Sequence, residues 1–220
     1  MWPHALLVAH VAVLGYWLGS ELVINSTFRL VSHAASMPFP ERQRLLDHVM
    51  HADQHVRYAL VLQAGMGTAL AALRGYIPGG MAAAWAAGAA CIAWLGYVEL
   101  VHRTRHRAIG QRLARIDRGS RYLLLALLLA VAFGLVGGAW PMPAWLRVKL
   151  GLFATVIACG VGIRLSLAGY FRTWAAMGRE GVDDASNATI RRTYWQATAV
   201  LLLLWLAIAG IVVVSIWKPW

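Results

Sequence analysis

The chain has 220 residues, of which 60% are hydrophobic and only 13% are charged, and its formal net charge is +11. Soluble domains carry roughly a quarter charged residues, so this composition excludes a soluble globular protein and indicates an integral membrane protein. All positive residues except Lys149 and Lys218 are arginines, and most of them lie between apolar segments. Such arginines are typical of the positive-inside rule and of contact with membrane lipid, so we expect no nucleic-acid binding.

Six apolar stretches of the chain are long enough to cross a bilayer, which takes roughly 20 helical residues each. We therefore predict a single all-α domain over residues 1–220, an integral membrane bundle of about six transmembrane helices. The expected spans lie near residues 5–30, 56–76, 81–101, 120–138, 145–169 and 194–217.

Arginines are concentrated in the loops that follow the first, third and fifth expected spans. Because arginine-rich loops stay on the cytoplasmic side, we expect these loops to face the cytoplasm. Both termini then lie on the periplasmic side of a bacterial inner membrane, an arrangement that requires an even number of spans.

Two side chains that could hold a cofactor lie at one depth in their spans. His10 is about five residues inside the first span and Lys149 about four residues inside the fifth, which corresponds to roughly 6–8 Å of helix. An imidazole and an ammonium that face one cavity are suited to bind a haem iron and to hold a haem propionate. His10 also fits a hydrogen-bonded structural histidine, and Lys149 fits a side chain that extends outward to the membrane interface.

A second group of candidates lies at the inner end of the second span. Three histidines there share one helix face: His48, His51 and His55. Together with His102 or His106 they could bind a metal ion or a second haem. The alternative is a solvated helix start, in which Asp47 pairs with His51.

Glu21 is a carboxylate deep within the first span. At that depth it is either protonated or paired with a cation, so it could accept a proton, bind a substrate nitrogen or form a helix-to-helix hydrogen bond. Arg29 lies about two turns farther along the same helix, which is too distant for direct contact.

Several stretches of the chain resemble a known family. The first helix reads His10-Val-Ala-Val-Leu-Gly-Tyr-Trp17-Leu-Gly, and Phe-Arg29-Leu follows near its end. The fifth span opens with Trp145-Leu-Arg-Val-Lys149-Leu, and the chain ends in Lys-Pro-Trp. In order and placement these segments are similar to those of the HemJ-type membrane protoporphyrinogen IX oxidases, which form a wider group with CopD-like copper-resistance membrane proteins.

This resemblance implies b-type haem, with His10 as axial ligand and with Lys149 and Trp17 in the cofactor site. It also implies a role for Arg29 in the oxidation and the transfer of electrons to the respiratory chain. The chain departs from the family in its extra hairpin, roughly residues 79–140, because the family has four spans. Arg29 also lies about two turns farther along the helix than the family arginine.

Three functions are compatible with these patterns. The first is a haem-b membrane oxidoreductase with one haem or two, which is protoporphyrinogen oxidase-like or passes electrons to quinone, with Glu21 as proton acceptor. The second is a copper-binding or copper-transport protein that uses His51 and His55. The third is a membrane anchor subunit of a dehydrogenase complex, in contact with a partner subunit or with further copies of itself.

Overall fold

The computed structural model describes residues 2–104 and 107–218, and these residues are helical apart from short turns. Six helices follow one another in the described residues: α1 (Trp2–His33), α2 (Phe39–Leu73), α3 (Gly80–Arg103), α4 (Ala108–Ala132), α5 (Ala144–Glu180) and α6 (Asp184–Trp217). All except α4 are long and apolar enough to cross a membrane. The predicted all-α bundle of a multi-pass membrane protein is confirmed.

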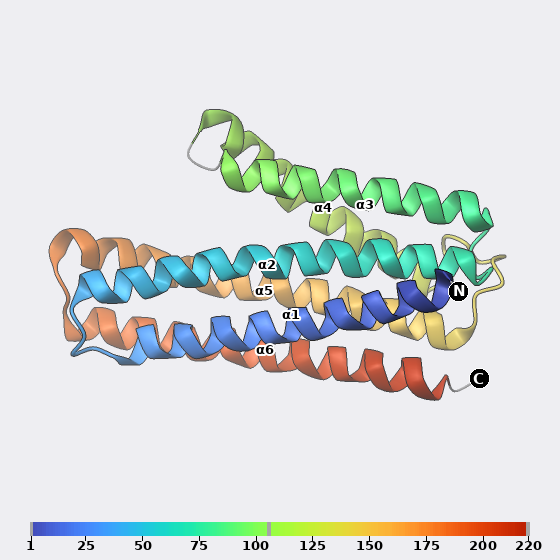
Figure 1. Ribbon diagram of the computed structural model, residues 1–220. Coiled ribbons are helices and arrows are strands. Elements are labelled where there is room, and N and C mark those ends of the chain that lie inside the picture. Colours follow the sequence, from blue (N-terminus) through green and yellow to red (C-terminus); the bar gives the residue numbers. More distant parts are fainter. Residues whose placement is uncertain (1, 105–106, 219–220) are drawn as a thin grey trace.

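The helices form a four-helix bundle with a hairpin at its side (Figure 1). α1 packs against α2 and α6, and α5 packs against α6. The hairpin joins this bundle through α3, which packs on α2, and through α4, which packs on α5. α1 begins and α6 ends at the same end of the bundle, which we call the outer end. The opposite end, with the turns at residues 34–38 and 181–183, is the inner end, and there the hairpin diverges from the bundle (Figure 1).

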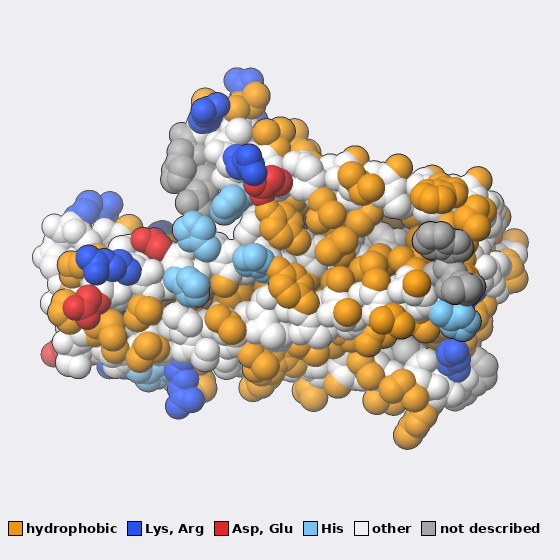
Figure 2. All heavy atoms as spheres, viewed as in Figure 1, with side chains coloured by type: hydrophobic (Ala, Val, Ile, Leu, Met, Phe, Trp, Pro, Cys, Tyr) orange, Lys and Arg blue, Asp and Glu red, His pale blue; other side chains and the backbone are white. Residues whose placement is uncertain are grey.

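The surface changes in character along the bundle axis. Hydrophobic side chains cover most of the face shown in Figure 2, whereas charged side chains gather mainly toward the inner end. Large apolar residues such as Trp85, Leu123 and Leu206 have about seven-tenths of their surface exposed. A soluble protein rarely exposes so much apolar surface, so we expect this apolar surface to contact lipid.

At the inner end the helices continue beyond the expected spans. α2 begins at Phe39 rather than near residue 56, and α5 continues to Glu180 rather than ending near residue 169. Polar residues in these extensions remain helical because the extensions pack on one another around a buried cluster that includes Leu46, Tyr170 and Ile190.

α4 differs most from its expected span, residues 120–138. It ends at Ala132, and Gly134 in the turn that follows has a φ of 74°, which favours glycine. The guanidinium of Arg147 on α5 donates a hydrogen bond of 2.9 Å to a carbonyl oxygen in the last turn of α4. This bond satisfies a helix-end carbonyl that otherwise lacks a partner, so the helix ends earlier than its apolar run suggests.

Candidate functional site

The first candidate site lies near the outer end, around His10 on α1. The Nδ1 atom of His10 is buried and has no hydrogen-bond partner among the described residues. The side chain of Gln63 on α2 donates a hydrogen bond of 2.8 Å to the backbone carbonyl of His10. The imidazole lies against Gly67, where an added Cβ atom would be 3.5 Å from Cε1. The ring is therefore packed on α2 through a glycine, and one of its nitrogens is free to bind a ligand.

Lys149 on α5 is the second residue of this site. After burial, the charge of Lys149 is the second influence on the His10 imidazole, which agrees with the common depth expected for the two residues. Arg74, at the end of α2, acts on Lys149 in turn. Lys149 is half-buried and Arg74 is exposed, and two positive charges so placed favour a ligand with negative charge.

These residues fit haem b, the cofactor implied by the sequence resemblance. Haem offers an iron to the unpartnered nitrogen of His10 and carboxylates to the basic groups of Lys149 and Arg74. The donor types therefore match the cofactor.

Three other predicted residues lie away from the pair. Trp17 is only 3% exposed, packs within the apolar core and donates its Nε1 hydrogen bond to Glu21 at 3.3 Å. Glu21 and Arg29 lie about 16 Å and 28 Å from His10 along α1, at 1.5 Å of rise per residue. Arg29 is exposed near the inner end of the helix. Glu21 and Arg29 are too far along α1 to contact a group bound between His10 and Lys149, whereas Trp17 is about 10 Å from His10 along the helix.

The second candidate site is a cavity of about 480 Å³ inside the bundle, lined by residues of all six helices. Its volume lies within the range of roughly 300–1,000 Å³ that is usual for small-molecule sites. Glu21 is one of its lining residues, whereas His10 and Lys149 are not. The walls are mostly apolar, and apart from Glu21 on α1 the charged side chains of the lining lie at one level of the cavity.

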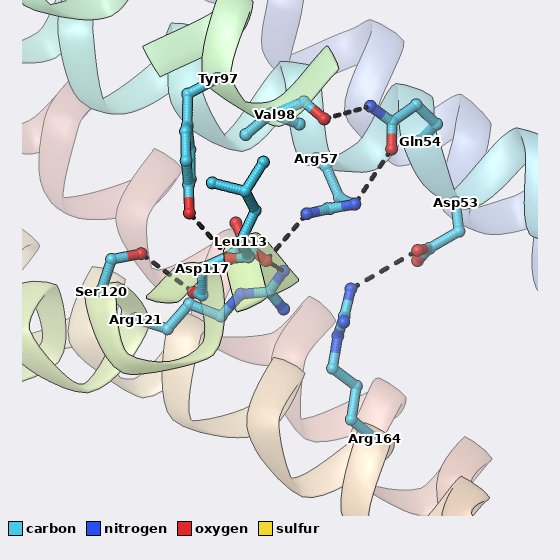
Figure 3. Close-up of polar contacts among 10 residues, drawn as sticks. All are labelled: Asp53, Gln54, Arg57, Tyr97, Val98, Leu113, Asp117, Ser120, Arg121 and Arg164. Carbon is cyan, nitrogen blue, oxygen red and sulfur yellow. Dashed lines mark hydrogen bonds and ion pairs between the residues drawn. The ribbon is translucent and has the colours of Figure 1, made fainter. Parts of the chain in front are cut away.

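That level, which we call the charged belt, consists of five residues from α2, α4 and α5 (Figure 3): Asp53, Arg57, Asp117, Arg121 and Arg164. Arg57 and Arg121 both donate to the same oxygen of Asp117, each at 2.8 Å. Asp117 is buried, so this carboxylate holds two guanidinium groups in place between α2 and α4. Arg164 makes one longer ion pair, 3.5 Å from Asp53.

Sequence reasoning missed the charged belt. Arg57 and Arg121 each lie at the second position of an expected span, beside an arginine-rich loop, and the sequence gives no sign that Asp117 pairs with both. Arg164, however, lies inside the expected fifth span of residues 145–169, where an arginine is costly and is a functional candidate by default. Its position within the apolar run was therefore the signal that could have led to this site.

The inner histidines lie on the exposed face between the bundle and the hairpin, where Figure 2 shows several histidines close together. His51 and His102 have ring centroids 6.2 Å apart, and His55 shares a hydrogen bond with Tyr16. His51 bonds to Asp47 through the backbone carbonyl, at 2.7 Å, rather than through the carboxylate. Within residues 2–104 and 107–218, no group of three or more His, Cys, Asp or Glu side chains is close enough to hold a metal ion. The alternative candidate His106 lies outside the described residues.

Comparisons of the chain with protein-family models, with curated proteins and with solved structures found no match. Its function is therefore argued from the two sites.

Proposed function

We propose that the protein is a haem-b-binding integral membrane oxidoreductase, which is protoporphyrinogen oxidase-like or passes electrons to a quinone. The buried, unpartnered Nδ1 of His10 carries this proposal. A buried polar atom without a partner is costly, and an iron ligand is a common role for such an imidazole. Haem, when bound, supplies the one-electron chemistry that the side chains of this chain do not supply.

The two basic residues complete the proposed site. Lys149 and Arg74 offset the charge of a carboxylate-bearing cofactor, and Gly67 leaves space for the imidazole against α2. The site lies near the outer end, which we expect from the distribution of arginines to face the periplasmic side of a bacterial inner membrane. An electron acceptor dissolved in the membrane could approach it there.

The test is a reduced-minus-oxidised absorption spectrum of the purified protein after expression with sufficient haem. We expect a Soret band and a reducible α-band in the wild type and the loss of most of this signal in His10→Ala. His33→Ala is the matched control, because His33 lies on the same helix and its Nδ1 already bonds to the carbonyl of Arg29 at 2.9 Å. That variant should keep the full spectrum.

Two results contradict the proposal. One is a colourless wild-type protein, and the other is an unshifted spectrum in His10→Ala. Elemental analysis of protein prepared without a histidine tag should find iron, whereas stoichiometric copper that is lost in His51→Ala/His55→Ala favours the copper function instead.

A further inference from the structure

The cavity is long in relation to its volume. On α2 its lining runs from Val49 to Thr68, nineteen positions that correspond to about 28 Å of helix. With a volume of about 480 Å³, a cavity of this length accommodates a chain better than a broad, flat ring system.

Polarity divides the cavity along this length. From Arg57 in the charged belt to Thr68 the wall of α2 extends for about 16 Å toward the outer end. Apolar residues line this part from three helices: Leu60, Val61, Ala64, Val156, Leu201 and Leu204. A length of 16 Å is close to half of the roughly 30 Å hydrocarbon core, which is the depth that one acyl chain covers.

The charged belt lies at the head of this apolar part. Its three arginines face two aspartates, and with Glu21, which lines the same cavity, the formal charges of the lining sum to zero. Asp117 is already shared by two arginines, whereas the ion pair that Arg164 makes among the described residues is the 3.5 Å contact with Asp53. Glu21 lies on the α1 wall, where it accepts a hydrogen bond from Trp17. Arg164, with 44% of its side chain exposed, therefore retains donors for an anionic oxygen.

We infer that this cavity binds an amphiphile with a long hydrocarbon chain and an anionic head group, with the head at Arg164 and the chain directed toward the outer end. An anionic oxygen accepts the hydrogen bonds that Arg164 still has to donate, and the chain fills the apolar part. The head group is a carboxylate or a phosphate, which a fatty acid or a phospholipid can supply. This inference is independent of the haem proposal, because it uses neither His10 nor Lys149.

The experiment is a titration of the delipidated, full-length protein in a non-ionic detergent, followed by native mass spectrometry. The probes are palmitate, its uncharged methyl ester and phosphatidylglycerol. We expect one equivalent of palmitate or of phosphatidylglycerol to bind, and the methyl ester to bind at least about ten-fold more weakly, because it lacks the charge-assisted hydrogen bonds. Binding of only one of the two anions identifies the source of the ligand and supports the inference.

Two variants separate the head-group contact from the chain contact. Arg164→Gln should weaken anion binding about ten-fold and leave the methyl ester unchanged. Gly160→Phe should abolish binding of all three probes, because Gly160 lines the cavity and a Cβ atom there meets no atom within 4 Å. A side chain added at this position therefore begins in open space at the wall of the cavity.

Matched controls exist on the same helix. Gly169→Phe adds the same ring at a glycine that also has no atom within 4 Å of an added Cβ but does not line the cavity. Arg172→Gln removes an exposed arginine beyond the charged belt. Both variants should bind palmitate like the wild type.

The inference is overturned if neither anion binds, if the methyl ester binds as tightly as palmitate, or if Gly160→Phe retains palmitate. Unchanged palmitate binding in Arg164→Gln also overturns the placement of the head group. The comparison of palmitate with its ester uses the wild type alone, so the inference can be refuted even if a variant fails to fold.

Discussion

Replacing Arg42 by methionine is expected to destabilise the inner end of the bundle strongly. Arg42 is fully buried, and its guanidinium joins three other helices. Nε donates to the carbonyl oxygen of Val31 on α1 at 3.1 Å, and Nη1 donates to Oδ1 of Asn187 on α6 at 3.0 Å. The guanidinium carbon also lies 5.1 Å from the ring centre of Trp174 on α5.

The magnitude follows from these contacts. Hydrogen bonds from a charged donor contribute about 1.5–3 kcal/mol each, and a desolvated cation–π contact contributes about 2 kcal/mol. Methionine keeps most of the apolar stem but leaves the carbonyl of Val31 and the amide of Asn187 without their partner. Because such terms are not additive, we expect a loss of about 3–5 kcal/mol in the free energy of unfolding, as is usual when one partner of a buried charged contact is removed.

The assay is reversible unfolding of the purified protein in mixed micelles with increasing fractions of denaturing detergent. Arg44→Met is the matched control, because Arg44 lies on the same helix two positions away and is exposed. Its free energy of unfolding should stay within about 0.5 kcal/mol of the wild type. If Arg42→Met unfolds at the same detergent fraction as Arg44→Met, then Arg42 does not hold the helices together and the reasoning fails.

Three further predictions concern the haem site, the hairpin and the start of α6. Lys149→Met should weaken haem binding about ten-fold in a haem titration, whereas Lys149→Arg should keep the wild-type affinity. Equal haem affinity in the wild type and both variants contradicts a role for the positive charge of Lys149. Gly65→Ala should lower the unfolding temperature, because the added Cβ atom would lie 2.5 Å from Cβ of Cys91 on α3. Adding Cys91→Gly to the same chain should restore most of the loss. No restoration in the double variant contradicts this packing of α3 on α2. The pKa of Asp183 is lowered by hydrogen bonds from Ser186, so its contribution to stability is present at neutral pH and is lost as the pH falls through that lowered pKa. Melting curves should show that Asp183→Ala is less stable than the wild type at pH 7 and that this difference in melting temperature shrinks in acid. A difference in melting temperature that stays constant with pH contradicts a stabilising role for the ionised carboxylate of Asp183.

Composition and apolar periodicity were sufficient to predict the membrane bundle, because crossing a bilayer requires runs of apolar helix that are visible in the sequence. They could not give the true helix ends at the inner side. Residues 39–55 precede the expected span, and only the spacing of His48, His51 and His55 indicates helix there, yet the whole stretch forms the first part of α2 because neighbouring extensions bury Leu46 and Val49. That stabilisation comes from tertiary contacts, which a one-dimensional pattern does not record.

The arginines show the same limit more sharply. Counting them by loop predicted the side of the membrane on which each loop lies, but the count treated all of them as equivalent. Arg42 is buried and forms hydrogen bonds that join neighbouring helices. Arg57 and Arg121 both pair with the carboxylate of Asp117, which is 60 positions from Arg57 and four positions from Arg121 in the chain. Arg164 differs from these three in the sequence, since it lies well inside an expected apolar span.

The contacts of the charged belt bear on the role of the extra hairpin. Asp117 belongs to α4, and it is the acceptor that allows Arg57 of α2 to lie within the bundle at this depth. α3 contributes to the same wall, because Gln54 of α2 bonds both to Arg57, at 3.1 Å, and to the backbone of Val98, at 3.5 Å. Without the hairpin, Arg57 loses the carboxylate with which it is paired, and the cavity lacks the walls that α3 and α4 supply. The hairpin therefore supplies both the counter-charge of Arg57 and part of the wall of the cavity.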